Sequence, residues 1–106
     1  MNKEKQIELI SILDKENLDI LHSKGADYAT VDVLSNFKRV SDIVKSMNLS
    51  IDTPVGYALF MTLMKIDRIN NLISNNKIPN NESVEDSFKD GINYFKLAYL
   101  NYIENK

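Results

Sequence analysis

The sequence lacks cysteine and has only three glycines and two prolines among its 106 residues. Without cysteine, disulfide bonds, thiolate metal sites and cysteine nucleophiles are excluded. The chain also contains no glycine-rich phosphate loop, no dinucleotide-binding fingerprint, no serine nucleophile elbow and no zinc-protease motif. The sequence signatures of several large enzyme classes are therefore missing.

A large charge of one sign is missing as well. The 13 lysines and arginines nearly balance the 15 aspartates and glutamates, which leaves a net charge of −2. A general nucleic-acid or acidic-membrane binder carries a basic excess, so this balance argues against both classes. The longest apolar run, residues 55–64, is far shorter than the roughly 20 residues of a membrane span. The N-terminus has no signal-peptide pattern, so we expect a single cytoplasmic domain covering 1–106.

The spacing of apolar residues predicts four helices, and no stretch alternates as a strand does. The first helix is expected at about 4–24, with Gly25 as its C-terminal stop. The second is expected to follow Asp32, a candidate N-cap, and to reach Met47. The fold class is therefore all-α.

The last two helices have clear start signals. Thr53 followed by Pro54 predicts a helix from there to about Ser74. Ser83 and Asp86 have the spacing of a capping box and open the fourth helix. Its expected apolar stripe is Val84, Phe88, Ile92, Phe95, Tyr99 and Tyr102.

Two segments are more apolar than a monomeric four-helix bundle needs. Residues 55–64 are apolar on every side of the helix, and residues 94–103 are apolar over most of its circumference. We therefore predict a homo-oligomer through helices three and four, most simply about a two-fold axis. The alternative is that helix three lies centrally and is covered by the other helices.

Carboxylates gather at the start of the fourth helix. Glu82, Asp86 and Asp90 share one side of it with Asn93, opposite the apolar stripe. Carboxylates one turn apart can hold Mg²⁺ or Mn²⁺ jointly, because these hard ions prefer oxygen ligands. Acidic residues in a first helical turn also favour the helix dipole, so a solvated face is the simpler interpretation.

Two cations lie one turn apart on the third helix. Lys65 and Arg68 could hold neighbouring phosphate oxygens, or they could pair with carboxylates of the fourth helix. His22 is the only histidine, so no second imidazole is present for a histidine metal site.

Four stretches in order, "KGADYA", "VDVLSNFKRVS", "MKIDRINNLI" and "ESVEDSFKDGINYF", resemble a family. They are similar to the phage and bacterial nucleotide-modification-associated proteins, relatives of the all-α MazG-like nucleoside triphosphate pyrophosphohydrolases. The resemblance spans about residues 20–100. It implies an oligomeric four-helix MazG-like bundle, a nucleotide or modified-nucleotide ligand and, in catalytic members, Mg²⁺-dependent release of pyrophosphate.

The resemblance also assigns residues. It implies nucleotide contacts by Lys24, Asp27, Tyr28, Asn36, Lys65, Arg68, Asn93 and Tyr94, and metal binding by Glu82, Asp86 and Asp90. Ser87 belongs to the same pattern on the fourth helix.

One departure from the family concerns the metal. Pyrophosphohydrolases carry Glu-x-x-Glu on the helix before the last, where this chain has "KIDR", residues 65–68. Cations at these positions weaken metal binding, because like charges repel. Lys65 and Arg68 could take over the electrostatic role of the metal, or Asp67 or a carboxylate of a second subunit could rebuild the cluster.

Three functions remain as hypotheses from the sequence. The first is nucleotide binding with Mg²⁺- or Mn²⁺-dependent diphosphate hydrolysis. The second is a non-catalytic phage protein that sequesters a signalling nucleotide. The third is a small protein-interaction module that acts on a host protein.

Overall fold

The structure is a computed structural model that describes residues 1–28, 32, 34–79 and 83–106; the side chains of Gly25, Ala26 and Tyr28 lie outside that description. Four helices follow one another: α1 (Lys3–Tyr28), α2 (Ser35–Met47), α3 (Pro54–Ser74) and α4 (Val84–Glu104). The described part of the chain contains no strand, so the all-α prediction is confirmed. None of these helices is long and apolar enough to cross a membrane.

The start signals of α3 and α4 act as predicted. The Thr53 hydroxyl accepts a hydrogen bond from the Gly56 amide at 3.0 Å, and Pro54 occupies the first turn of α3. Ser83 accepts a hydrogen bond from the Asp86 amide at 3.1 Å. Both caps satisfy amide groups that have no partner within the helix.

The ends of α1 and α2 differ from the prediction. α1 continues through Gly25 to Tyr28, because its last turn is bonded to α3 through Asp27, as described below. α2 begins at Ser35, and Asp32 instead accepts a hydrogen bond from the Leu34 amide at 3.0 Å. At the other end of α2, Asn48 adopts a left-handed conformation with φ of 53° and closes the helix.

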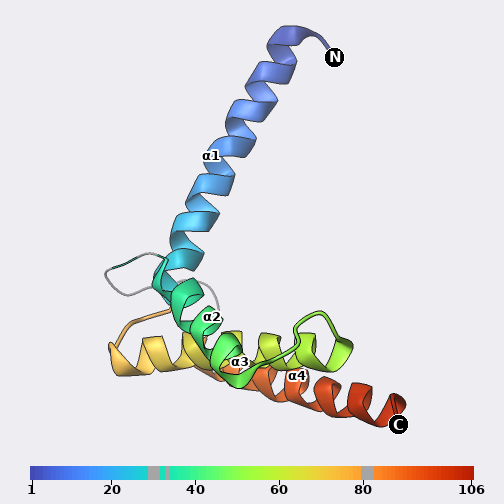
Figure 1. The fold of residues 1–106 in the computed structure, drawn as a ribbon. Coiled ribbons are helices and arrows are strands. Elements are labelled where there is room, and N and C mark those ends of the chain that lie inside the picture. Colours follow the sequence, from blue (N-terminus) through green and yellow to red (C-terminus); the bar gives the residue numbers. More distant parts are fainter. Residues whose placement is uncertain (29–31, 33, 80–82) are drawn as a thin grey trace.

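α3 is the element on which the other three helices pack (Figure 1). α3 and α4 run side by side, and α2 crosses α3. The last turn of α1 meets the C-terminal part of α3, and the rest of α1 extends away from the other helices. The radius of gyration is 17.5 Å, compared with about 13 Å for a compact chain of this length. One copy therefore does not close into a four-helix bundle.

Small residues form the contact between α3 and α4. Ala58, Ser87 and Ala98 are buried, and a Cβ added to Gly91 would lie 3.5 Å from the Cβ of Lys65. The large apolar stripe predicted for α4 is mostly exposed instead. The predicted stripe exists, but within one chain its large side chains have little to pack on.

Candidate functional site

A buried ion pair joins α1 to α3. The Arg68 guanidinium donates to the Asp27 carboxylate at 2.9 Å, and both side chains are 2% exposed. Arg68 also donates to the hydroxyl of Ser87 on α4, which is fully buried. Burying two charges costs solvation energy, and this cost is offset only when the charges are paired and hydrogen-bonded. The three residues therefore fix the positions of three helices relative to one another.

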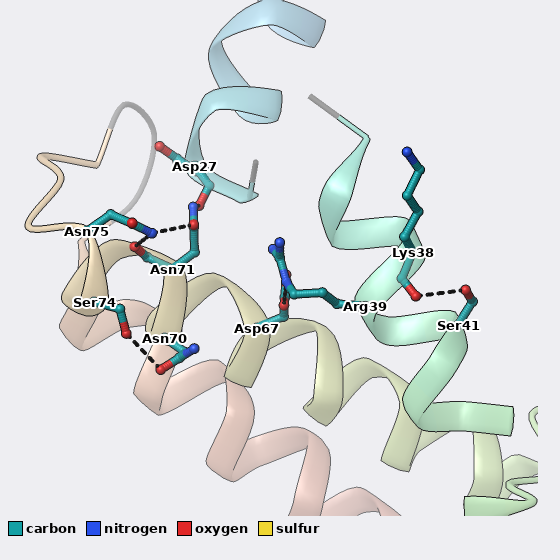
Figure 2. Close-up of polar contacts among 9 residues, drawn as sticks. All are labelled: Asp27, Lys38, Arg39, Ser41, Asp67, Asn70, Asn71, Ser74 and Asn75. Atoms are coloured by element: carbon teal, nitrogen blue, oxygen red, sulfur yellow. Dashed lines mark hydrogen bonds and ion pairs between the residues drawn. The ribbon is translucent and has the colours of Figure 1, made fainter. Parts of the chain in front are cut away.

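Asn71 adds a backbone contact to this polar cluster, which we define as Asp27, Arg68, Asn71 and Ser87. Its side-chain amide donates to the backbone carbonyl of Asp27 at 3.0 Å, and its oxygen accepts a hydrogen bond from Asn75 at 2.8 Å. Figure 2 shows Asn71 between Asp27 and Asn75, at the junction of α1 with the end of α3. These contacts hold the additional turn of α1 that follows Gly25.

Lys65 and Asp90 continue the cluster towards solvent. The Lys65 ammonium lies 3.4 Å from the Asp90 carboxylate, and their side chains are 14% and 43% exposed. Lys65 lies one turn before Arg68 on α3, and Asp90 lies three residues after Ser87 on α4. The charged residues therefore form a continuous row from the buried Asp27 to the accessible Asp90.

A second ion pair lies on the other side of α3. Arg39 of α2 donates through Nε and Nη2 to both oxygens of Asp67, at 2.7 and 3.0 Å (Figure 2). The hydrogen bond to Asp67 raises the pKa of Arg39 above its ordinary value. Because Asp67 is bound to α2, it does not complete an acidic cluster with Asp86 and Asp90.

The structure brings together only part of the predicted site. Asp27 and Arg68 meet directly, as do Lys65 and Asp90. Tyr94 is half-buried one turn after Asp90, and Asn36 is buried on α2. Lys24, Asp86 and Asn93 are exposed. The Tyr28 side chain and Glu82 lie outside the described residues.

Arg68 is placed differently from a solvent-facing phosphate clamp. It is 2% exposed, and its guanidinium binds Asp27 and Ser87. A phosphate that reached Arg68 would have to replace these partners. Lys65 is the more accessible cation of the predicted pair.

Sequence reasoning missed Asn71 and Arg39, and it considered Asp67 only as a residue that could rebuild the metal cluster, not as the partner of Arg39. A signal for Asn71 was present, because it lies three residues after Arg68 and so shares its face of α3. Nothing in the sequence indicated that Arg39 and Asp67 meet, since 28 residues separate them.

The described residues contain no group of three or more His, Cys, Asp or Glu side chains that could hold a metal ion. Since Glu82 is not among them, Mg²⁺ or Mn²⁺ binding through Glu82, Asp86 and Asp90 stays a prediction.

Comparison of the chain with protein-family models, curated proteins and solved structures gives no match. The resemblance to MazG-like proteins therefore rests on the four sequence stretches alone.

Proposed function

We propose that this protein binds a nucleotide at the row of charged residues that runs along α3 and α4 from Arg68 to Asp90. One observation carries the proposal. Three residues assigned to a nucleotide site from two separate stretches of sequence, Asp27, Lys65 and Arg68, lie in two ion pairs on neighbouring turns of α3. A MazG-like arrangement of the helices is part of the same proposal.

Lys65 is the residue that we expect to contact phosphate. Its ammonium group lies 3.4 Å from the carboxylate of the half-exposed Asp90. A phosphate group carries more negative charge than one carboxylate and can compete for the ammonium. Tyr94 follows Asp90 by one helical turn and is placed to contact the sugar or base.

Arg68 and Asp27 act as positioning residues in this proposal. The ion pair holds α1 against α3, and the Ser87 hydroxyl fixes the guanidinium against α4. Their positive and negative charges largely cancel, so the net attraction for phosphate comes from Lys65. This arrangement supports binding more directly than hydrolysis, because Asp67 is already bound to Arg39.

The test is a thermal-shift titration with nucleoside mono-, di- and triphosphates and cyclic dinucleotides, each in Mg²⁺ and in chelator. A nucleotide at 100 times its dissociation constant stabilises the native state by about 2.7 kcal/mol. We expect a shift that Lys65→Met removes and that Lys45→Met, a matched change on the exposed face of α2, leaves intact. Chromatography of the recovered nucleotide then separates sequestration from hydrolysis.

Two results would overturn the proposal. One is a panel without any shift, which leaves the protein-interaction module as the remaining hypothesis. The other is a shift that Lys65→Met and Lys45→Met reduce equally, since binding would then reflect general charge rather than this site.

A further inference from the structure

The large apolar side chains of α4 form an open surface. Five residues spaced along one side of the helix are 49–62% exposed: Phe88, Ile92, Phe95, Tyr99 and Tyr102. Towards the C-terminal end of α4 this surface becomes a groove of about 440 Å³ between α3 and α4. The groove is lined by Val55, Leu59, Phe95, Lys96, Ala98, Tyr99 and Tyr102.

α1 presents a second apolar surface without a partner in the same chain. Eight of its apolar residues are 41–70% exposed: Ile7, Leu9, Ile10, Ile12, Leu13, Leu18, Ile20 and Leu21. A helix of 26 residues is about 39 Å long, and α1 is bonded to α3 through Asp27 in its last turn. Figure 1 shows the rest of α1 extending away from the other three helices.

The total exposed area indicates how much surface is left uncovered. One copy exposes 8006 Å², whereas a compact protein of 12.2 kDa exposes about 6,000 Å². The excess of about 2,000 Å² per chain lies within the roughly 1,000–2,500 Å² that each subunit of an obligate homodimer buries in its interface. An excess of this size fits a second copy of the chain.

The two apolar surfaces of one copy lie apart (Figure 1) and do not cover each other. α1 is attached near Arg68 and Asn71, in the C-terminal part of α3, whereas the groove begins at Val55, in the first turn of α3. From its attachment α1 leads away from α3 and α4 (Figure 1). In a symmetric pair, however, the α1 surface of each copy can cover the α4 surface of the other, because every contact across a two-fold interface occurs twice.

We propose that two copies of this chain form a dimer in which α1 of each copy lies along α4 and in the apolar groove of the other. Charge supports this pairing. Asp14 lies within the apolar face of α1, four residues from both Ile10 and Leu18, and Lys96 lines the groove. In such a dimer, α1 of one copy completes a helical bundle with α3 and α4 of the other copy.

The first experiment measures mass by light scattering and sedimentation equilibrium over a range of concentrations. We expect twice the chain mass of 12.2 kDa, and a dimer dissociation constant raised at least tenfold by Ile10→Glu or by Tyr99→Glu. Both residues are exposed in one copy, so neither change disturbs the fold of the monomer. Lys15→Glu, on the polar side of α1, is the matched control and leaves the dimer intact.

The second experiment locates α1. The chain has no cysteine, so single cysteines can be placed at Ile10 or Leu13 and, in a separate variant, at Phe95 or Tyr99. Mixing an α1 variant with a groove variant under mild oxidation should give a disulfide-linked pair containing one copy of each. A cysteine at Lys15 should not cross-link to either groove position.

Three outcomes would overturn this proposal: a monomer at every concentration, a dimer that neither glutamate variant weakens, and a dimer in which no α1–groove pair cross-links. Placing both cysteines in one chain distinguishes folding back from exchange, because folding back gives an internal disulfide without a dimer. None of these measurements depends on nucleotide binding, so the two proposals fail or succeed separately.

Discussion

Arg68 reaches back 41 residues to the carboxylate of Asp27, and both side chains are withdrawn from water. This ion pair, with Ser87 beside it, is the point at which α1, α3 and α4 are held together. Only four apolar residues are buried among those described: Val40, Ala58, Leu72 and Ala98.

Removing one partner of the buried pair should therefore be costly. Asp27→Asn or Arg68→Met is expected to lower the free energy of unfolding by about 3–5 kcal/mol, because a charge is left buried without its partner. The measurement is urea unfolding at a fixed protein concentration, with Asp42→Asn on the exposed face of α2 as control. The double change Asp27→Leu with Arg68→Met should cost less than the sum of the single changes, and a fully additive double variant would contradict the pairing.

Arg39→Lys tests the two-pronged contact with Asp67. Lysine keeps the charge but offers no planar fork, so it cannot bind both carboxylate oxygens as Arg39 does. We expect a loss of about 1.5–3 kcal/mol in unfolding free energy, the usual value of hydrogen bonds to a charged group. An unchanged urea midpoint for Arg39→Lys would show that charge alone holds α2 on α3.

The cap of α3 gives a smaller effect. Thr53→Ala removes the acceptor for the Gly56 amide and should cost about 1 kcal/mol. Thr53→Ser keeps the hydroxyl and should retain most of the stability. Thermal unfolding of the two variants side by side is sufficient, and equal losses would assign the effect to the lost methyl group rather than to the cap.

Two of the helical glycines, Gly56 of α3 and Gly91 of α4, should respond in opposite ways to alanine. At Gly56 a Cβ would lie 1.7 Å from the Ser50 carbonyl oxygen, so the backbone must shift, and we expect a loss of about 1–3 kcal/mol from overpacking. At Gly91 a Cβ would lie 3.5 Å from the Cβ of Lys65, an ordinary contact. Gly91→Ala should therefore gain about 0.5–1 kcal/mol from helix propensity, and urea unfolding of both variants measures the contrast.

Acid should weaken the start of α2. The hydrogen bond from Lys38, then that from the Leu34 amide, lowers the pKa of Asp32 below its ordinary value of 3.8. The carboxylate thus adds stability above that value and loses it as pH falls through the lowered pKa. Asp32→Asn should be less stable than the parent at neutral pH and equal to it in strong acid; a constant difference across the pH series would exclude this linkage.

The sequence was informative wherever a local rule operates. Thr53–Pro54 and Ser83–Asp86 placed the starts of α3 and α4, because capping involves residues a few positions apart. At Gly25 a local rule predicted the end of α1 wrongly. The tendency of glycine to stop a helix was outweighed by the contacts of Asp27 with Arg68 and Asn71, which lie in a distant part of the chain.

The candidate site shows the same division. Spacing brought Lys65 and Arg68 to one side of α3, but it could not indicate that the Lys65 side chain stays partly accessible while Arg68 is buried. That difference depends on where α1 meets α3. The spacing of apolar residues also predicted the stripe from Phe88 to Tyr102, but only the structure shows that its side chains are exposed in one copy.

The isolated position of α1 has a consequence for the life of the protein in a cell. Residues 1–22 are exposed throughout, and the start of α1 extends away from the other helices (Figure 1). In a lone copy these turns depend mainly on backbone hydrogen bonds and helix propensity, and a helix held that way frays in water. If exchange between copies covers this segment, dilution unwinds it and exposes it to proteases, while abundance folds it and protects it. The helix content measured by circular dichroism would then rise with protein concentration. In a cell, the chain would be degraded most readily when its concentration is low.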